Sequence, residues 1–274
     1  MRRRQTALLF SLLAFGYAFL YVPIFSLIVY SFNVSRLVTV WGGFSTRWYG
    51  ELLHNDQILS AAWLSLRIAT MNATFSVVLG TLAAITLVRF GKFRGRLLFS
   101  TMVSAPLVMP DVILGLASLL LFVTMDHMIG WPAGRGITTI TLAHITFSTA
   151  FVTVVVQSRL SQFDISLEEA AMDLGAQPWK VFLLITLPMI APSLLAGWLL
   201  AFTLSLDDLV IASFVAGPGS TTLPMVVYSS VRLGVSPQIN ALATVIVALV
   251  SCCVLIAGWL THRQERRRPP SPAG

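Results

Sequence analysis

The chain has 274 residues, of which 56% are hydrophobic and 11% charged, and its formal net charge is +7. Soluble domains usually carry about 25% charged residues, so this composition leaves too little polar surface to cover a water-soluble globule. The basic charges lie in short clusters between long apolar runs, a distribution that membrane topology explains and that argues against a nucleic-acid partner.

Six apolar segments are long enough to cross a bilayer as helices, because about 20 residues at 1.5 Å each span a hydrocarbon core of about 30 Å. The predicted spans are residues 7–31, 59–88, 97–124, 138–158, 189–214 and 240–261. The first is longer than the apolar region of a signal peptide, roughly 7–15 residues, and lacks a clear cleavage site, so it is predicted to remain a span. We therefore predict an all-α integral membrane protein with a six-helix transmembrane domain over residues 1–262.

Lys and Arg residues are distributed unequally between the two sides of these spans. Thirteen lie at the N-terminus, in the second and fourth connections and in the tail, whereas four lie in the connections on the opposite side. The positive-inside rule therefore predicts that both termini are cytoplasmic. The tail, residues 263–274, is basic and rich in proline and is predicted to be disordered.

The sequence contains no recognisable catalytic motif. It has no Gly-x-x-x-x-Gly-Lys-Ser/Thr phosphate loop, so ATP is not expected to bind this chain in the usual way. The histidines at 54, 127, 144 and 262 show no metal-ligand spacing and are interpreted as structural or solvated. We therefore predict neither an enzyme nor a metal site.

The fourth connection, residues 159–188, is the longest on the cytoplasmic side. Ser166 and Glu169 have the spacing of a capping box, which predicts that a short helix starts at Ser166. Gly175 suits the end of that helix. A turn then leads into a second apolar helix, which Pro188 is predicted to break just before the fifth span. A connection that only joined two spans would not need this organisation.

This connection resembles the EAA loop of ABC-importer permeases. Its residues Glu169-Ala170-Ala171, Gly175 and Ile185-Thr186-Leu187-Pro188 match the pattern Glu-Ala-Ala-x3-Gly-x9-Ile-x-Leu-Pro in full. In that family the short helix docks into a cleft on a separate ATPase subunit. The resemblance therefore implies a type I importer-permease fold, with ATP and Mg²⁺ bound by the partner ATPase. It also implies an ATPase-coupling segment that comprises Glu169, Ala170, Ala171, Gly175, Leu187 and Pro188.

Four further segments, residues 37–41, 46–50, 105–113 and 205–211, resemble the permeases of polyamine importers. The likeness is greatest to the second permease subunit of the putrescine systems. It implies a permease in the bacterial inner membrane that imports putrescine, with spermidine or another solute as the alternative. The implied partners are a homologous second permease, an ATPase dimer and a periplasmic binding protein, on which solute specificity is expected mainly to rest.

Ionisable side chains inside the predicted spans are Arg67, Asp111, Asp207 and Asp208. A carboxylate at the bilayer centre costs roughly 2.5–3.5 kcal/mol on insertion scales, so each aspartate needs a partner or a wet cavity. Asp111 follows Pro106 and Pro110, which break the helix, and broken helices in transporters normally line a cavity. Putrescine carries two positive charges at neutral pH, because its amines resemble that of lysine.

Two interpretations of the aspartates stay open. In the first, Asp111, Asp207 and Asp208 line the substrate pathway and offset the desolvation of the ammonium groups. In the second, Arg67 pairs with Asp207 and Asp208 and the residues only stabilise the fold. The depths, roughly 13 Å for Arg67 and roughly 10 Å for the aspartates at 1.5 Å per residue, are compatible with that pair.

Two other classes of protein are less consistent with the sequence. A cation carrier driven by an ion gradient would account for the intramembrane acids, but it predicts internal repeats with equivalent broken helices, and no such repeat is evident. A membrane scaffold or enzyme lacks a nucleophile, metal set or ligand cluster to support it.

Overall fold

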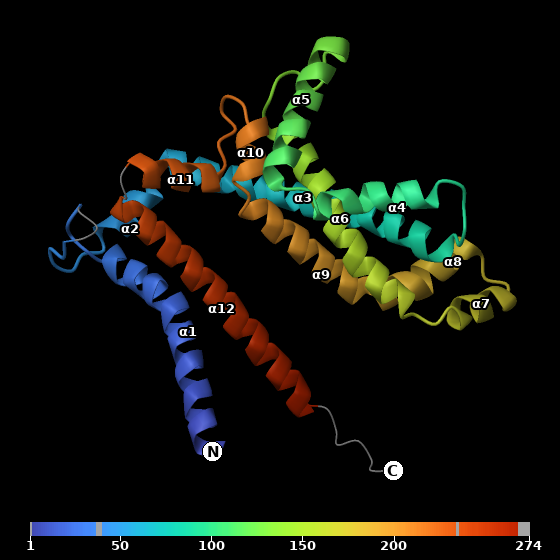
Figure 1. The fold of residues 1–274 in the computed structure, drawn as a ribbon, viewed down its shortest axis with the longest axis horizontal. Coiled ribbons are helices and arrows are strands. Elements are labelled where there is room, and N and C mark those ends of the chain that lie inside the picture. Colours follow the sequence, from blue (N-terminus) through green and yellow to red (C-terminus); the bar gives the residue numbers. More distant parts are fainter. Residues whose placement is uncertain (1, 37–39, 234–235, 268–274) are drawn as a thin grey trace. The chain divides into compact units, whose positions relative to one another are not determined.

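The structure, a computed structural model, describes residues 2–36, 40–233 and 236–267, and these fold almost entirely into helices (Figure 1). Part of the polyamine-type motif at residues 37–41 therefore lies outside the described residues, as do residues 268–274 of the tail. In chain order the elements are α1 (Arg2–Ser31), α2 (Arg47–Leu53), α3 (Asp56–Arg89), α4 (Arg96–Ser104), the 3₁₀ turn η1 (Ala105–Leu107), α5 (Asp111–Ile129), α6 (Ile137–Ser161), α7 (Ser166–Asp173), α8 (Pro178–Val181), the π-helical turn η2 (Phe182–Thr186), α9 (Leu187–Leu206), α10 (Val210–Val215), α11 (Leu223–Leu233) and α12 (Pro237–Arg267).

Five helical stretches of the described chain are long and apolar enough to cross a membrane. They are Leu9–Ser31, Asp56–Arg89, Asp111–Ile129, Ile137–Ser161 and the continuous run Pro178–Leu206. A shorter apolar stretch, Pro237–Cys252, begins α12. An all-helical membrane protein is therefore confirmed, while six spans stays a prediction.

The predicted third span, residues 97–124, is interrupted, as its two prolines predict. α4 ends at Ser104, a 3₁₀ turn that contains Pro106 follows, and α5 begins only at Asp111, directly after Pro110. The prolines explain the interruption, because each lacks a backbone N–H and disfavours helical geometry at the residue before it. The predicted break before Asp111 is therefore present.

The predicted fifth span, residues 189–214, is wrong at both ends. The helix is already continuous from Pro178, and Pro188 does not break it, because the π-helical turn η2 lies directly before this proline and leaves room for its ring. At the other end α9 stops at Leu206, and a new helix begins at Val210. Asp207 and Asp208 therefore lie in a break between two helices.

The start of the predicted disordered tail is also wrong. α12 continues through Arg267, so residues 263–267 are helical.

The chain divides into two compact units, residues 1–59 with 227–274, and residues 60–226. In the first unit, α12 packs against α1 and α2. The indole N–H of buried Trp48 donates to the backbone carbonyl of Asn33 at 2.6 Å. The amide of Gln238, at the start of α12, donates to the carboxylate of Glu51 at 3.0 Å.

In the second unit, α3, α6 and α9 share a close-packed core. An added Cβ at Gly80 of α3 would lie 2.8 Å from Cγ1 of Val152 on α6. The fully buried amide of Asn72 donates to Ser148 Oγ at 3.0 Å and to the carbonyl of Ala201 at 2.8 Å, so one side chain joins all three helices. Small residues and interhelical hydrogen bonds of this kind are typical of membrane helix packing.

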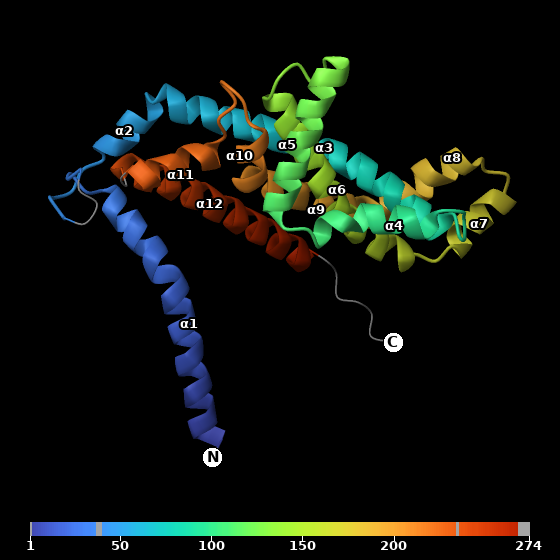
Figure 2. The same cartoon turned by 45° about the horizontal axis from the view of Figure 1, so that its top comes forward.

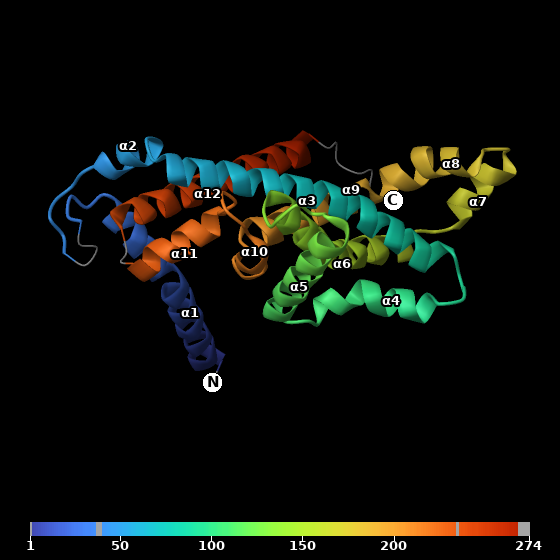
Figure 3. The same ribbon diagram turned by 90° about the horizontal axis from the view of Figure 1, so that it is seen from above.

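The two candidate sites lie in different parts of this second unit. α7 and α8 lie together at one end, beyond the ends of α3 and α6 (Figures 2 and 3). The break between α9 and α10 lies away from that end, where α10 packs against α5.

Candidate coupling site and intramembrane polar cluster

The short helix predicted in the fourth connection is present as α7, but its predicted capping box is wrong. Ser166 is the first helical residue rather than the cap, and no side chain caps the helix. The carboxylate of Asp164 instead accepts the backbone N–H of Ser166 at 3.0 Å. That hydrogen bond, supported by one from the Ser166 hydroxyl, lowers the pKa of Asp164 below its ordinary value. Aspartate commonly binds the N–H two residues ahead in this way.

Gly175 ends α7, as the sequence predicts. Its φ of +85° lies in the left-handed region that favours glycine. The N–H of Gly175 donates to the carbonyl of Met172 at 2.9 Å, and the N–H of Ala176 donates to that of Ala171 at 3.1 Å. These two bonds form a Schellman motif, which fixes where the helix stops and the chain turns.

Most of the predicted coupling residues lie on the surface of the chain. Glu169, Ala170, Gly175 and Pro188 are exposed, whereas Ala171 and Leu187 are partly buried. The apolar side chain of Leu174, between the motif residues, is 90% exposed. An apolar and small-residue surface of this kind allows close approach of another backbone.

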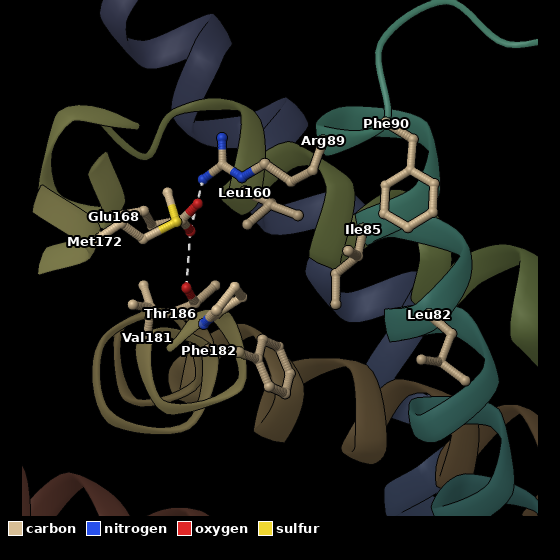
Figure 4. Close-up of a pocket in the computed structure, with 11 residues that line it drawn as sticks. Leu82, Ile85, Arg89, Phe90, Leu160, Glu168, Met172, Val181, Phe182 and Thr186 are labelled. Atoms are coloured by element: carbon tan, nitrogen blue, oxygen red, sulfur yellow. Dashed lines mark hydrogen bonds and ion pairs between the residues drawn. The ribbon is translucent and has the colours of Figure 1, made fainter. Parts of the chain in front are cut away.

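The side chain of Glu168, the residue before Glu169, points into the protein and not to the surface. Its Oε1 accepts a hydrogen bond from Arg89 Nη2 at 3.1 Å and another from Thr186 Oγ1 at 2.7 Å (Figure 4). The side chains of Arg89 and Glu168 are only 16% and 13% exposed. Glu168 therefore joins α7 to the end of α3 and to η2.

A cavity of about 420 Å³ adjoins these three side chains. Figure 4 shows Glu168 and Arg89 at one side of it and apolar side chains of α3 and η2 around the rest. Its apolar lining includes Leu82, Ile85, Phe90, Leu160, Met172, Val181 and Phe182.

A second polar group lies in the break between α9 and α10. His144 of α6 is 2% exposed, and its Nδ1 lies 2.7 Å from Ser205 Oγ while its Nε2 lies 3.1 Å from Asp208 Oδ2. An ionised carboxylate can only accept, so Nε2 carries the proton and donates to Asp208. The same carboxylate accepts the backbone N–H groups of Ile211 at 3.3 Å and Ala212 at 2.7 Å, which begin α10.

The structure separates the four ionisable residues that the sequence places in the spans. Asp208 is held by His144, whereas Asp207 and Asp111 are exposed. Arg67 is also exposed and lines a groove of about 490 Å³ between α3 and α6. The predicted ion pair of Arg67 with Asp207 or Asp208 is absent from the ion pairs of the described residues, and His144 takes that place at Asp208.

Two residues of these sites, Glu168 and His144, were not singled out from the sequence. Glu168 precedes the motif glutamate and has no distinguishing pattern, although a buried basic residue at the end of a predicted span would need an acid. The sequence predicts a structural or solvated His144; the structure agrees with the structural alternative and adds its partners, Ser205 and Asp208. In the part of the chain that the structure describes, no group of three or more His, Cys, Asp or Glu side chains is arranged to hold a metal ion.

Comparison with known proteins gives consistent matches. Residues 76–268 match the family described as "Binding-protein-dependent transport system inner membrane component". The chain is 63% identical over 257 residues to the putrescine transport system permease protein PotI of Escherichia coli (strain K12), covering 94% of this chain and 92% of that protein. It is 43% identical over 251 residues to the spermidine/putrescine transport system permease protein PotC of the same strain, covering 92% of each.

Solved structures share the fold. A bacterial ABC transporter involved in the import of the acidic polysaccharide alginate matches with a TM-score of 0.73 at 16% identity, over 94% of this chain and 96% of the solved chain. The inward-facing MetNI methionine ABC transporter matches with a TM-score of 0.60 at 17% identity, over 76% of this chain and 95% of the solved chain.

Proposed function

Because the chain belongs to the binding-protein-dependent inner membrane components, and among them to the polyamine-importer permeases, we propose that it carries putrescine from periplasm to cytoplasm. Family membership confirms the predicted ABC-importer permease, its inner-membrane location and its role in transport rather than catalysis. The observation that carries the choice of solute is the 63% identity to a putrescine permease over 94% of the chain. Spermidine is the second candidate, supported by the 43% identity to a spermidine/putrescine permease.

The proposed topology has six spans with both termini in the cytoplasm. α1, α3, α6 and the run from α8 through α9 are four of the spans, and α4 with α5 forms a broken third one. α12, whose apolar stretch is shorter, is the sixth. In this topology α7 and the ends of α3 and α6 lie on the cytoplasmic side, as an ATPase contact requires.

The exposed surface of α7 is the proposed docking site for the ATPase. Glu169, Ala170 and Gly175 are available to a partner, and the Schellman turn at Gly175 sets the position of this surface. ATP and Mg²⁺ are bound by that ATPase, which forms a dimer beneath this permease and a homologous second one. A periplasmic binding protein delivers the solute.

The intramembrane aspartates divide between the two open interpretations. Asp207 and Asp111 are exposed at broken helices and are assigned to the path of the dication, where a carboxylate stabilises a desolvated ammonium group. Asp208 is engaged by His144 and by the start of α10, so it is assigned to stabilising the break.

The test is uptake of radiolabelled putrescine in a bacterial strain that lacks its own polyamine importers. The chain is expressed with its second permease, ATPase and binding protein, and a Walker-motif variant of the ATPase is the control. We expect uptake that needs all four components and that unlabelled putrescine suppresses more than equal spermidine. Stronger suppression by spermidine would favour the second candidate, and uptake of neither would reject the polyamine assignment.

A further inference from the structure

We propose that Glu168 transmits movement of α7 to the membrane helices through its hydrogen bonds to Arg89 and Thr186. We call these three side chains the joint. The proposal rests on the proposed docking of the ATPase at α7. Glu168 acts through other residues and is therefore a positioning residue for coupling, distinct from the surface that contacts the ATPase.

The geometry joins three elements at one oxygen atom. Oε1 of Glu168 accepts from Arg89 Nη2 at 3.1 Å and from Thr186 Oγ1 at 2.7 Å. Arg89 is the last residue of α3, and Thr186 is the last residue of η2 before α9. One carboxylate on α7 is therefore bonded to the end of one proposed span, α3, and to η2 within another (Figure 4).

The inward orientation of the Glu168 side chain is not shared by Glu169, the next residue. Successive residues of a helix point about 100° apart, and Glu169 is exposed where Glu168 is 13% exposed. The two glutamates therefore divide the work: Glu169 faces the partner, and Glu168 faces the chain's own helices.

Apolar packing between α7 and α3 does not replace the hydrogen bonds of Glu168. The cavity of about 420 Å³ lies between Met172 of α7 and the side chains of Leu82 and Ile85 on α3. Side chains across an unfilled space lose their dispersion contacts, so apolar packing transmits displacement weakly here. The hydrogen bond of Glu168 to Arg89 therefore links α7 to α3 across this space.

Removing either Glu168 or Arg89 leaves the largely buried charge of the other without its ion-pair partner. Arg89 Nε is buried and has no hydrogen-bond partner among the described residues, so the bond to Glu168 is the main compensation of this guanidinium. Charge-assisted hydrogen bonds are roughly twice as strong as neutral ones, and removing one member of a buried pair strands the other. Replacing both members together avoids a stranded charge.

The first test uses the complete importer in lipid nanodiscs with its binding protein and putrescine. Glu168→Gln should retain ATPase co-purification and ATP hydrolysis, while the putrescine moved per ATP hydrolysed falls at least about five-fold. Arg89→Gln should do the same, and Thr186→Val should give a smaller loss. Asp56→Asn is the matched control, because Asp56 is an exposed acid in the first turn of α3, at the opposite end of that helix from Arg89.

A double-mutant cycle then tests whether the residues act as one unit. If they do, Glu168→Gln with Arg89→Gln should be no worse than the poorer single variant, because the second change removes a contact that is already lost. Multiplied losses in the double variant, or a wild-type ratio of putrescine to ATP in Glu168→Gln, would overturn the joint.

A second measurement does not depend on the cargo. A spin label is attached at Leu174→Cys, which is 90% exposed in the wild-type chain, after both native cysteines are replaced by serine. Glu168→Gln should increase the label's mobility in the pair of permeases purified without the ATPase, which would cover Leu174, and Asp56→Asn should not. Unchanged mobility would reject the joint even in an active importer, whereas increased mobility in a complex that imports no putrescine would reject only the proposed solute.

Discussion

Asp207 and Asp208 are adjacent in the sequence, yet their carboxylates have different surroundings. Asp208 accepts from His144 and from two backbone N–H groups of α10, and Asp207 is exposed. Removing a partner of a buried hydrogen bond costs about 1–3 kcal/mol. The difference predicts that replacing aspartate by asparagine has different effects at positions 207 and 208.

We expect Asp208→Asn and His144→Ala to lower the thermal stability of the purified complex, because each disrupts the bonds that begin α10. Asp207→Asn should leave stability unchanged and reduce putrescine uptake, since it removes only an exposed charge. Thermal unfolding of detergent-solubilised complexes and uptake in cells measure the two effects. Equal stability of all three variants would contradict the assigned role of Asp208.

At Gly175, backbone conformation limits substitution. A residue with a Cβ in the left-handed region costs about 1–2 kcal/mol, and no atom lies within 4 Å of an added Cβ, so the strain comes from the backbone alone. Gly175→Trp adds bulk on the docking surface and should reduce ATPase co-purification while the spans stay folded. Gly134→Trp, also at a positive φ and in open space but on the other side of the predicted membrane, is the control. Equal co-purification in both variants would argue against docking at α7.

The long helices were predictable from hydropathy and the break before Asp111 from its prolines, but the stop at Leu206 and the continuity at Pro188 were not. Asp207 and Asp208 mark a polar place in the apolar run across residues 189–214, but the sequence does not show that the helix stops there or that Asp208 is held by His144, which is distant in the sequence. Pro188 was predicted to break a helix, and only the π-helical turn before it explains why the helix continues. The stop at Leu206 and the continuity at Pro188 both involve contacts or backbone geometry that a hydropathy pattern does not contain.

The coupling loop was better predicted, because its motif residues and turn are local. The stop at Gly175 follows from the conformational freedom of glycine, and the start of α7 was placed correctly for the wrong reason. Glu168 could not be separated from Glu169 by pattern, because their difference lies in what each side chain faces across the fold.

The contact between α3 and α6 predicts intolerance of even one methyl group. A Cβ at Gly80 would lie 2.8 Å from Val152 Cγ1 and 3.1 Å from the backbone N of Thr153, so the helices must separate. Overpacking of this kind costs about 1–3 kcal/mol. Gly80→Ala should therefore lower the unfolding temperature, and Val152→Ala in the same chain should restore part of it. Gly16→Ala, where nothing lies within 4 Å, is the matched control and should have no such cost.

For the whole molecule, Arg67 is a charge within a predicted span that forms no ion pair among the described residues. It is exposed in the apolar helix α3, and a charge at that depth needs a counter-charge. Since no acid of the described residues pairs with it, we expect the counter-charge on the second permease.

Arg67→Leu should therefore reduce recovery of the second permease with this chain, because it strands the partner's acid. The ratio of the two permeases after affinity purification measures this effect. Arg36→Leu, an exposed charge outside the predicted spans, is the control. Full recovery with Arg67→Leu would remove Arg67 from the subunit interface.

Because Glu168 is largely buried and Glu169 is exposed, ionic strength can separate attachment of the ATPase from transmission of its movement to the spans. The distance over which charges interact in water falls from about 10 Å at 0.1 M salt to about 3 Å at 1 M, and buried pairs are screened much less. Added salt should therefore weaken attachment of the ATPase at exposed Glu169 while the bond of Glu168 to Arg89 persists. In complexes held together by a cross-link between permease and ATPase, the putrescine moved per ATP should then be nearly independent of salt. A ratio that falls with salt in the cross-linked complex would show that transmission runs through charges that water can reach.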